Sequence, residues 1–562
     1  MSDHRPEHSP LTPKNADEEK LTQAPAGKDS SFRHNGHEKT PSRPEAGGPG
    51  PGQVSLVGAG PGDPGLITVK GLECIRSADY IIYDLLANPR LLEEAPGHCE
   101  KLYAGKKAGS HSLTQEEITE LILDCARKGG HVVRLKGGDP YVFGRGGEEA
   151  LRLAAEGIPF QVVPGVTAPV AGLCYAGIPI THRGKATSFH VITAHRTAGG
   201  IEPEECAGLA GLDGTLIFMM GLGQAENIAG GLLAGGMSPD TPAAVISKAT
   251  LPGQQTLVST LAELPRALKE RPMPFPAMIV VGEVVGLRRE LNFFEELPLF
   301  GKRVLVTRSS QKGSRLNRLL EEAGAEVIAA PVQELIPVPG ALEESLNQLK
   351  AYSYILFTST LTVELFFQAL KVKGLDARAL AGKTLCAVGR ATAEGLEKQG
   401  LGADILPREY TAEGLFQELA PRLKPTDRVL LPQSAAARPY LQEKLTPLCS
   451  LEVAELYRPE EIRQAAARLE QLLEDAAGEP VDAAVFTSSA GVAGFCRLPK
   501  ALELLEKAAI FSIGPLTSAA LRKQGLKPRE SRESTMSGLM EELCRWGREE
   551  RNTPEAGKNE QI

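Results

Sequence analysis

The chain has 562 residues, enough for about three to five domains, and 42% of its residues are hydrophobic, enough to build real cores. Its net charge of −8, without a long basic stretch, argues against nucleic acid as the main partner. The nine cysteines are scattered and form no CxxC pair, which predicts reduced thiols and no zinc site. No apolar run reaches the ~18–20 residues that span a membrane, and the N-terminus has no apolar signal-peptide region. We therefore expect a cytoplasmic protein without a membrane partner.

Both ends of the chain read as tails. Residues 1–52 hold eight prolines, four histidines and mixed charge, with almost no large apolar residues. Such a segment cannot bury enough surface to offset its ordering entropy, so we expect it to be disordered. Its histidines lack the tight spacing of a metal site. Residues 548–562 resemble it in composition and are expected to form a shorter tail.

A first glycine-rich loop follows the tail. Residues 54–57 are apolar and predict a strand, residues 58–65 read GAGPGDPG, and residues 66–77 have the pattern of a helix. A dinucleotide-binding fingerprint would need glycine where Asp63 stands. This departure argues against a nicotinamide oxidoreductase.

A second loop of the same kind begins at residue 136. Residues 131–135 predict a strand that ends in Gly137, Gly138 and Asp139. Glycine lets a ligand approach bare backbone, and ligands of open α/β sheets bind at the carboxyl ends of strands. The two loops together therefore predict a binding site. The alternative for either loop alone is a tight strand-to-helix turn.

The second half contains an internal repeat. RVLVTR at 303–308 returns as RVLLPQ at 428–433, and ILFTS at 355–359 returns as AVFTS at 484–488. Residues 387–392 and 410–415 also have counterparts at nearly the same offset. The repeat predicts two similar α/β lobes over residues 301–547. Short β-rich runs alternate with helical patterns, as at 314–322 and 392–399, which favours parallel sheets.

Each repeat places hydroxyl groups between a strand and a helix. These are Ser359 and Thr392 in the first repeat and Ser488 and Thr517 in the second. Hydroxyls here can cap helices, and helix N-termini attract anions. Two facing lobes would then form a cleft for a polycarboxylate, whereas capping alone is the alternative. Residues 287–300 join the halves and are too short and too apolar for a free linker.

The first half resembles the tetrapyrrole methylase family, within it the uroporphyrinogen-III C-methyltransferases, over residues 53–290. The matching segments include VGAGPGDP at 57–64, GKKAGSH at 105–111, GGDPYVFGRGGEE at 137–149 and PAMIVVGEVV at 276–285. The resemblance implies a two-domain α/β fold. It also implies transfer of two methyl groups from S-adenosylmethionine to uroporphyrinogen III, giving precorrin-2, and a homodimer formed through this half.

The resemblance also implies site residues. It assigns S-adenosylmethionine contacts to Pro61, Gly137, Gly138, Asp139, Val142, Thr167, Ala168, Met220 and Ala249. Asp84 matches the family's proposed proton acceptor and Lys106 its proposed donor. The alternatives are core packing for Val142 and Met220, a helix N-cap for Asp84 and a solvated charge for Lys106. We also expect basic groups around the substrate's carboxylates, drawn from Lys106, Lys107, Arg134, Lys136, Arg145, Arg183 and Lys185.

The second half resembles the uroporphyrinogen-III synthase family, on GKRVLVTR at 301–308, the two FTS segments, VGRATAEGL at 388–396 and SIGPLTSAAL at 512–521. That family closes hydroxymethylbilane into uroporphyrinogen III with loss of water. The resemblance makes Ser359, Thr392, Ser488 and Thr517 substrate contacts and Tyr457 a helper for the departing hydroxyl. A partly buried core tyrosine is the alternative for Tyr457. Gln433 stands where the family often has arginine.

The two resemblances predict a bifunctional enzyme that makes precorrin-2 for sirohaem or cobalamin, because the synthase's product is the methylase's substrate. No metal is implied. Two other hypotheses stay open. The methylase could act on a later corrin intermediate, or the second half could be a non-catalytic tetrapyrrole-binding module.

Overall fold

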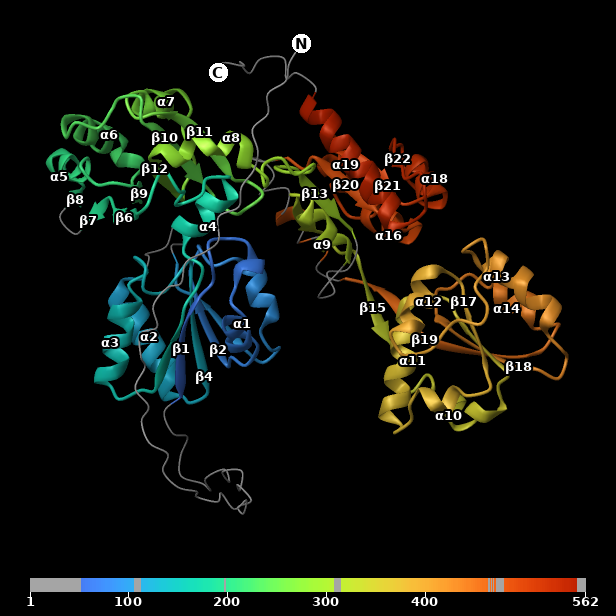
Figure 1. Ribbon diagram of the computed structural model, residues 1–562. Helices are drawn as coiled ribbons and strands as arrows, with labels where there is room; N and C mark the ends of the chain where they lie inside the picture. The colour runs from blue at the N-terminus through green and yellow to red at the C-terminus, as the bar shows by residue number, and fades with distance from the viewer. Residues whose placement is uncertain are drawn as a thin grey trace, which may run out of the picture. The chain divides into compact units, whose positions relative to one another are not determined.

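The computed structural model describes residues 52–105, 113–196, 199–307, 315–462, 465, 467, 469–471 and 480–552 (Figure 1). The expected tail at 1–52 lies outside these residues except for Gly52. Over the described ranges, no helix combines the length and the apolar character needed to cross a membrane.

The first sheet is entirely parallel, with strand order β3-β2-β4-β1-β5. Its strands are β1 (Gln53–Gly58), β2 (Tyr80–Tyr83), β3 (Glu100–Tyr103), β4 (His131–Lys136) and β5 (Phe160–Val163). The strands predicted at 54–57 and 131–135 are confirmed. The helix predicted over 66–77 begins later. Pro64–Leu66 forms a 3₁₀ turn, and the Thr68 hydroxyl accepts a hydrogen bond from the Gly71 amide, so α1 spans Val69–Arg76.

Helices cover both faces of this sheet. One buried cluster joins α1 to side chains such as Val57, Ile81 and Val133. The other joins α2 (Gln115–Arg127) and α3 (Gly146–Ala155) to Val54 and Ile82. The strands are therefore apolar on both sides, which explains the continuous apolar runs in the sequence.

The second sheet is mixed, with order β11-β10-β12-β9-β6. Only β6 and β9 pair in parallel. Its strands are β6 (Phe189–Thr193), β9 (Thr215–Met219), β10 (Pro242–Ser247), β11 (Gln255–Thr260) and β12 (Ala277–Val281). Two buried clusters line its two faces. One includes residues of α5 (Pro203–Leu209), α6 (Ala225–Ala234) and α7 (Leu264–Glu270), the other residues of α4 (Ala168–Tyr175).

The second half contains the two expected α/β lobes, each with a five-stranded sheet. One sheet has the order β14-β13-β20-β21-β22, and the other β15-β19-β18-β16-β17. The first consists of β13 (Arg303–Val306), β14 (Glu326–Ala329), β20 (Ala483–Phe486), β21 (Ala509–Ser512) and β22 (Arg529–Glu530). The second consists of β15 (Gln333–Pro337), β16 (Tyr354–Phe357), β17 (Thr384–Ala387), β18 (Arg428–Ser434) and β19 (Ser450–Glu461). All neighbours are parallel except β15 and β19, which departs from the purely parallel sheets expected.

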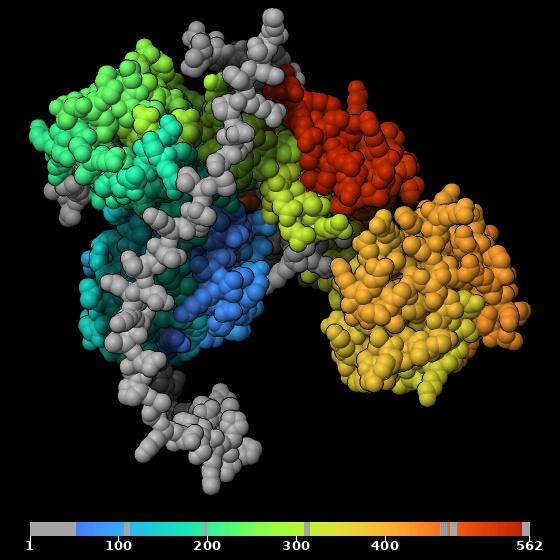
Figure 2. Space-filling view, viewed as in Figure 1, coloured from blue at the N-terminus to red at the C-terminus, as the bar shows by residue number. Residues whose placement is uncertain are grey.

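The repeats are crossed between these lobes. The matching motifs make β13 the counterpart of β18, β16 of β20 and β17 of β21. Yet β13 pairs with β20, and β18 pairs with β16, so each sheet combines one strand from each repeat at its centre. Residues 333–461 form one lobe, coloured yellow to orange in Figure 2, and the two ends of the half form the other.

The helical patterns predicted at 314–322 and 392–399 correspond to α9 (Arg315–Glu322) and α12 (Arg390–Glu397). The other helices of the second half include α11 (Thr360–Val372), α13 (Ala412–Leu419), α14 (Tyr440–Leu445), α16 (Ser489–Cys496), α18 (Pro515–Lys523) and α19 (Met536–Asn552). The tail predicted from residue 548 is wrong in its first part, because α19 continues to Asn552. Trp546 in this helix is buried against Phe511, with ring centroids 5.5 Å apart, and the apolar face of the helix holds it on the sheet.

Candidate active sites

The two glycine loops of the first half lie directly against each other. The Gly138 amide donates to the Gly60 carbonyl at 2.7 Å, and the Gly60 amide donates to the Gly138 carbonyl at 3.2 Å. A Cβ atom on Gly165 would lie 2.2 Å from the Gly138 oxygen, and one on Gly58 would lie 2.5 Å from the Gly165 Cα atom. These glycines thus allow the carboxyl ends of β1, β4 and β5 to meet backbone to backbone.

Asp139 joins the loop that follows β4 to the loop that follows β5. One carboxylate oxygen accepts from the Tyr141 amide at 2.8 Å, and the other accepts from the Gly165 amide at 3.0 Å. Its neighbour Gly137 faces Leu86, because an added Cβ atom would lie 2.5 Å from the Leu86 Cβ atom. Asp139 and Gly137 thus fix the shape of the loop that follows β4. The sequence alone could not distinguish this structural role from a contact with the ligand.

The loop at 61–63 reaches the turn that contains Ala249. The Asp63 amide donates to the Thr250 hydroxyl at 3.0 Å, and the Tyr175 hydroxyl donates to the Asp63 carboxylate at 2.7 Å. Thr167 and Ala168 lie at the start of α4, where the Ala168 amide nitrogen lies 3.9 Å from a Cβ atom built on Gly138. The structure therefore brings together the predicted contacts near residues 61, 138, 168 and 249.

Strained backbone concentrates at the same loops. Six non-glycine residues of the described chain have positive φ, and five of them lie in the segments that hold predicted donor contacts: Phe143, Arg145, Met220, Lys248 and Thr250. Such conformations cost about 1–3 kcal/mol each and cluster at ligand sites. Val142 and Met220 are 39% and 50% exposed, so neither packs in the core as the alternative supposed.

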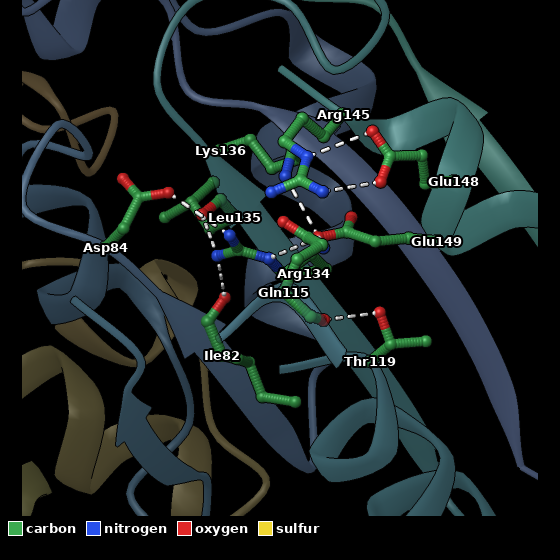
Figure 3. A network of polar contacts seen from close by, with 10 residues as sticks. All are labelled: Ile82, Asp84, Gln115, Thr119, Arg134, Leu135, Lys136, Arg145, Glu148 and Glu149. Atoms are coloured by element: carbon green, nitrogen blue, oxygen red, sulfur yellow. Dashed lines mark hydrogen bonds and ion pairs between the residues drawn. The ribbon is translucent and has the colours of Figure 1, made fainter. Parts of the chain in front are cut away.

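Asp84 lies at the end of β2 and joins a buried ion network (Figure 3). Its Oδ2 atom pairs with Arg134 Nη2 at 3.2 Å, and its Oδ1 atom accepts from the Leu86 amide at 3.1 Å. Asp84 thus caps a turn, not a helix, which corrects the alternative considered for it. Arg134 in turn pairs through Nε with Glu149 Oε1 at 3.3 Å, and Lys136 Nζ reaches the same oxygen at 3.0 Å.

This network corrects the expected role of two basic residues. Arg134 and Lys136 are only 3% and 4% exposed, so they stabilise the interior and do not offer free charges to a substrate. Burial, and secondarily the Arg134 charge, lowers the pKa of Lys136 below its ordinary value. Arg145 is exposed but pairs with Glu148.

Sequence reasoning missed Glu149, which neutralises the two buried cations. It is fully buried in the first turns of α3, and Gln115 Nε2 also donates to its Oε1 atom at 3.0 Å. Its Oε2 atom has no hydrogen-bond partner among the described residues. The feature of the sequence that could have identified Glu149 is the pair of glutamates that follows the second glycine loop. Lys106, the predicted proton donor, lies outside the described residues, as does Lys107.

In the lobe of residues 333–461, Ser359 and Tyr457 come together. Ser359 Oγ lies 3.4 Å from the Tyr457 hydroxyl, and it also accepts from the Thr362 amide to cap α11. Tyr457 is half-buried and packs against the lobe's apolar cluster, so the core alternative also describes it. Thr392 is nearly buried in the first turn of α12, and Gln433 is buried near the end of β18.

The other lobe repeats the hydroxyl positions. Ser488 Oγ accepts from the Gly491 amide at 3.1 Å and caps α16, and Thr517 is buried in the first turns of α18. These positions correspond to Ser359 and Thr392 through the repeat. No group of three or more metal-ligating side chains occurs within the described ranges.

Two family models match the chain in separate regions. The model described as tetrapyrrole (corrin/porphyrin) methylases matches residues 53–265, and the model described as uroporphyrinogen-III synthase HemD matches residues 314–541. The porphyrin biosynthesis protein HemD of Ruminiclostridium josui is 37% identical over 499 residues, covering 88% of this chain and 98% of that protein. The uroporphyrinogen-III C-methyltransferase of Bacillus subtilis is 41% identical over 350 residues, covering 62% and 72%.

Solved structures match each half. Uroporphyrin-III C-methyl transferase from Thermus thermophilus, complexed with S-adenyl homocysteine, is 41% identical and covers 42% of this chain and 100% of its own, with a TM-score of 0.37. Uroporphyrinogen III synthase from the same organism is 25% identical and covers 44% and 99%, with a TM-score of 0.29.

Proposed function

Since the chain belongs to the tetrapyrrole methylases in its first half and to the uroporphyrinogen-III synthases in its second, we propose that it performs two consecutive steps of tetrapyrrole biosynthesis. The second half cyclises hydroxymethylbilane to uroporphyrinogen III with loss of water. The first half methylates that product twice to give precorrin-2, for sirohaem or cobalamin. The observation that carries the proposal is the presence of both matches on one chain that aligns with nearly the whole of a porphyrin biosynthesis relative.

The methyl donor S-adenosylmethionine supplies a methyl group bound to a positively charged sulfur. Gly138, where an added Cβ atom would meet only the Ala168 amide, offers it bare backbone, together with the start of α4 at Thr167 and Ala168 and the strained turn at Ala249. Gly137 belongs to the same set of proposed contacts through its backbone, although Leu86 closes its Cβ side. Exposed apolar side chains at Val142 and Met220 suit its uncharged parts, and Pro61 and Asp139 complete the set. The rate enhancement comes chiefly from orientation, because the donor is already a strong electrophile.

Asp84 is proposed to accept the proton that the methylated ring carbon must lose. Its Oδ2 atom is paired with the buried guanidinium of Arg134, which fixes the carboxylate at the strand end. Lys106 is proposed as the proton donor. A proton acceptor must be held within hydrogen-bond reach of the reacting group, and the network supplies that restraint.

In the second half, the Tyr457 hydroxyl is proposed to help the substrate's hydroxyl group depart as water. Ser359 supports it at 3.4 Å. Thr392, Ser488 and Thr517 are proposed contacts for the substrate's carboxylates, each at or beside a helix N-terminus that favours negative charge. A methylase half at 53–290, a second half that runs from 301 to the end of α19 at Asn552, a cytoplasmic location and a homodimer formed through the methylase half belong to the same proposal.

An anaerobic assay tests both activities at once. The full chain is supplied with hydroxymethylbilane and S-adenosylmethionine, and products are followed by absorbance and mass. Uroporphyrinogen III with two added methyl groups is expected. Unmethylated uroporphyrinogen I, which forms without a synthase, would refute catalysis by the second half and favour a binding module. Unmethylated uroporphyrinogen III would refute the methylase.

A further inference from the structure

The segment that joins the two halves is fastened to the methylase half by specific contacts. It comprises residues 287–300, called the connector below, and includes α8 (Arg288–Leu291). Glu295 accepts two hydrogen bonds on Oε1, from Gln254 Nε2 at 2.8 Å and from the Thr256 hydroxyl at 2.7 Å. Its Oε2 atom pairs with Arg288, whose guanidinium also donates to the Ala176 carbonyl.

A polar route leads from Glu295 to the predicted donor site. Gln254 is 3% exposed, and its Oε1 atom accepts from the Thr250 amide at 2.8 Å. Thr250 is 2% exposed, lies next to Ala249 and has a φ of 67°, a conformation that its surroundings must impose. The Thr250 hydroxyl accepts a hydrogen bond from the Asp63 amide. The connector thus supports the turn of Ala249 and, through it, the loop of Pro61.

An aromatic route reaches the same loop. Phe294 is buried, and its ring lies edge-on to Tyr175 with centroids 4.8 Å apart. Tyr175 also faces Phe293 at 5.8 Å, and its hydroxyl donates to the Asp63 carboxylate. Both routes therefore end at Asp63, one at its amide and one at its side chain.

We infer that the connector is part of the support of the methyl-donor site, and that Glu295 is a positioning residue that holds the Ala249 turn and the Pro61 loop through Gln254. The inference rests on the proposed function, since it concerns donor binding by the first half. A residue that fixes two donor loops without touching the donor raises the donor's affinity by reducing the ordering that binding requires.

The test uses the full chain and S-adenosylhomocysteine, titrated calorimetrically. Glu295→Ala is expected to raise its Kd about tenfold, the size of effect that supporting residues exert. Gln254→Met cuts the polar route while leaving the Glu295–Arg288 pair, and it is expected to have a similar effect. Glu295→Gln keeps an oxygen for Gln254 and is expected to recover most of the affinity.

Two further readouts separate positioning from general damage. The KM for S-adenosylmethionine should rise while kcat changes little, and turnover of hydroxymethylbilane should stay at the wild-type level. Glu296→Ala is the matched control, because Glu296 contacts Asn292 and Arg551 instead of the methylase half, and its Kd should equal that of the wild type. The double variant Glu295→Ala/Gln254→Met should bind no more weakly than the weaker single variant.

The outcomes are distinct. A wild-type chain that fails to bind S-adenosylhomocysteine refutes the proposed function itself. A wild type that binds, together with Glu295→Ala and Gln254→Met variants of unchanged Kd, overturns the inference alone. Independent, additive losses in the double variant would also overturn it, because the two residues would then not act along one route.

Discussion

Replacing Glu149 with alanine should destabilise the first sheet strongly. The change removes the carboxylate partner of Lys136 and leaves Arg134 with Asp84 and with the carbonyls of Ile82 and Leu135, and both cations are nearly buried. Removing one partner of a buried ion pair costs about 3–5 kcal/mol. Because Arg134 keeps its ion pair with Asp84, we expect the lower end, about 3 kcal/mol.

Hydrogen exchange followed by mass spectrometry is the suitable assay. The only tryptophan, Trp546, lies in the second half and reports on a different sheet. Amides of β2 and β4 that exchange through unfolding should lose protection about a hundredfold, since each 1.4 kcal/mol is a factor of ten. Tryptophan fluorescence should show an unchanged unfolding transition for the second half.

The neighbouring Glu148 supplies the control. It is exposed and pairs with Arg145 three residues before it, so Glu148→Ala should change stability by less than about 1 kcal/mol. If β4 protection changes as little in Glu149→Ala as in Glu148→Ala, the buried network does not stabilise the sheet. The reasoning about Arg134 and Lys136 would then be wrong.

Three further predictions concern the loops, the second half and the pH dependence. Gly165→Ala should destabilise the loop edge by about 1–3 kcal/mol and weaken binding of S-adenosylhomocysteine in calorimetry, because the new Cβ atom would lie 2.2 Å from the Gly138 oxygen. Tyr457→Phe should lower turnover of hydroxymethylbilane about tenfold or more without unfolding the lobe, because only its hydroxyl is removed. Burial lowers the pKa of Lys136, so above this lowered pKa the unfolded chain holds a proton that the folded chain has lost, and stability rises with pH up to the ordinary value of 10.5. In urea unfolding at a series of pH values below that value, Lys136→Met should flatten this rise.

Matched controls accompany these changes. A Cβ atom on Gly147 of α3 meets nothing within 4 Å, so Gly147→Ala should preserve donor binding. Tyr440→Phe removes a hydroxyl elsewhere in the same lobe, and Lys128→Met removes a surface cation. Donor binding that survives Gly165→Ala, unchanged turnover in Tyr457→Phe, or an equal pH slope for the two lysine variants would each contradict its prediction.

Two strands of the first sheet could be predicted from sequence, because each is a short, largely apolar run that leads directly into glycine. The predicted strands at 54–57 and 131–135 match β1 and β4 to within one residue at each end. The charges of Arg134 and Lys136 misled the interpretation, because their neutralising partner Glu149 stands 15 and 13 residues further on, in a different element. Pairing between distant residues is not visible in a single local pattern.

The repeat was visible, but its crossing was not. The local sequences of β16 and β20 are nearly equivalent, so either could pair with β13 as far as strand propensity is concerned. Which of these two strands pairs with β13 depends on the path of the chain after β14 and β15, which is a property of the tertiary structure. The end of α19 was missed for another reason. The charged residues after Trp546 resemble a tail in composition, although Trp546 itself anchors the helix to the sheet.

In the second half, residues far apart in the chain come together in the sheet of each lobe, and the connector contributes to the core of one lobe. Leu299, at its end, shares a buried cluster with Val304 and Trp546, whereas Phe294, five residues earlier, packs on Tyr175 of the methylase half. One short segment is therefore anchored in the core of a synthase lobe and beside the donor loops. A ligand can influence a distant site only through contacts that differ between two states. Through the connector, substrate binding in the second half would thus change donor affinity only if it shifted Phe294 or Glu295. The ion pair between Arg90 of the methylase half and Glu321 of α9 is a second contact between the halves, so the two would work as independent enzymes only if both sets of contacts stayed fixed.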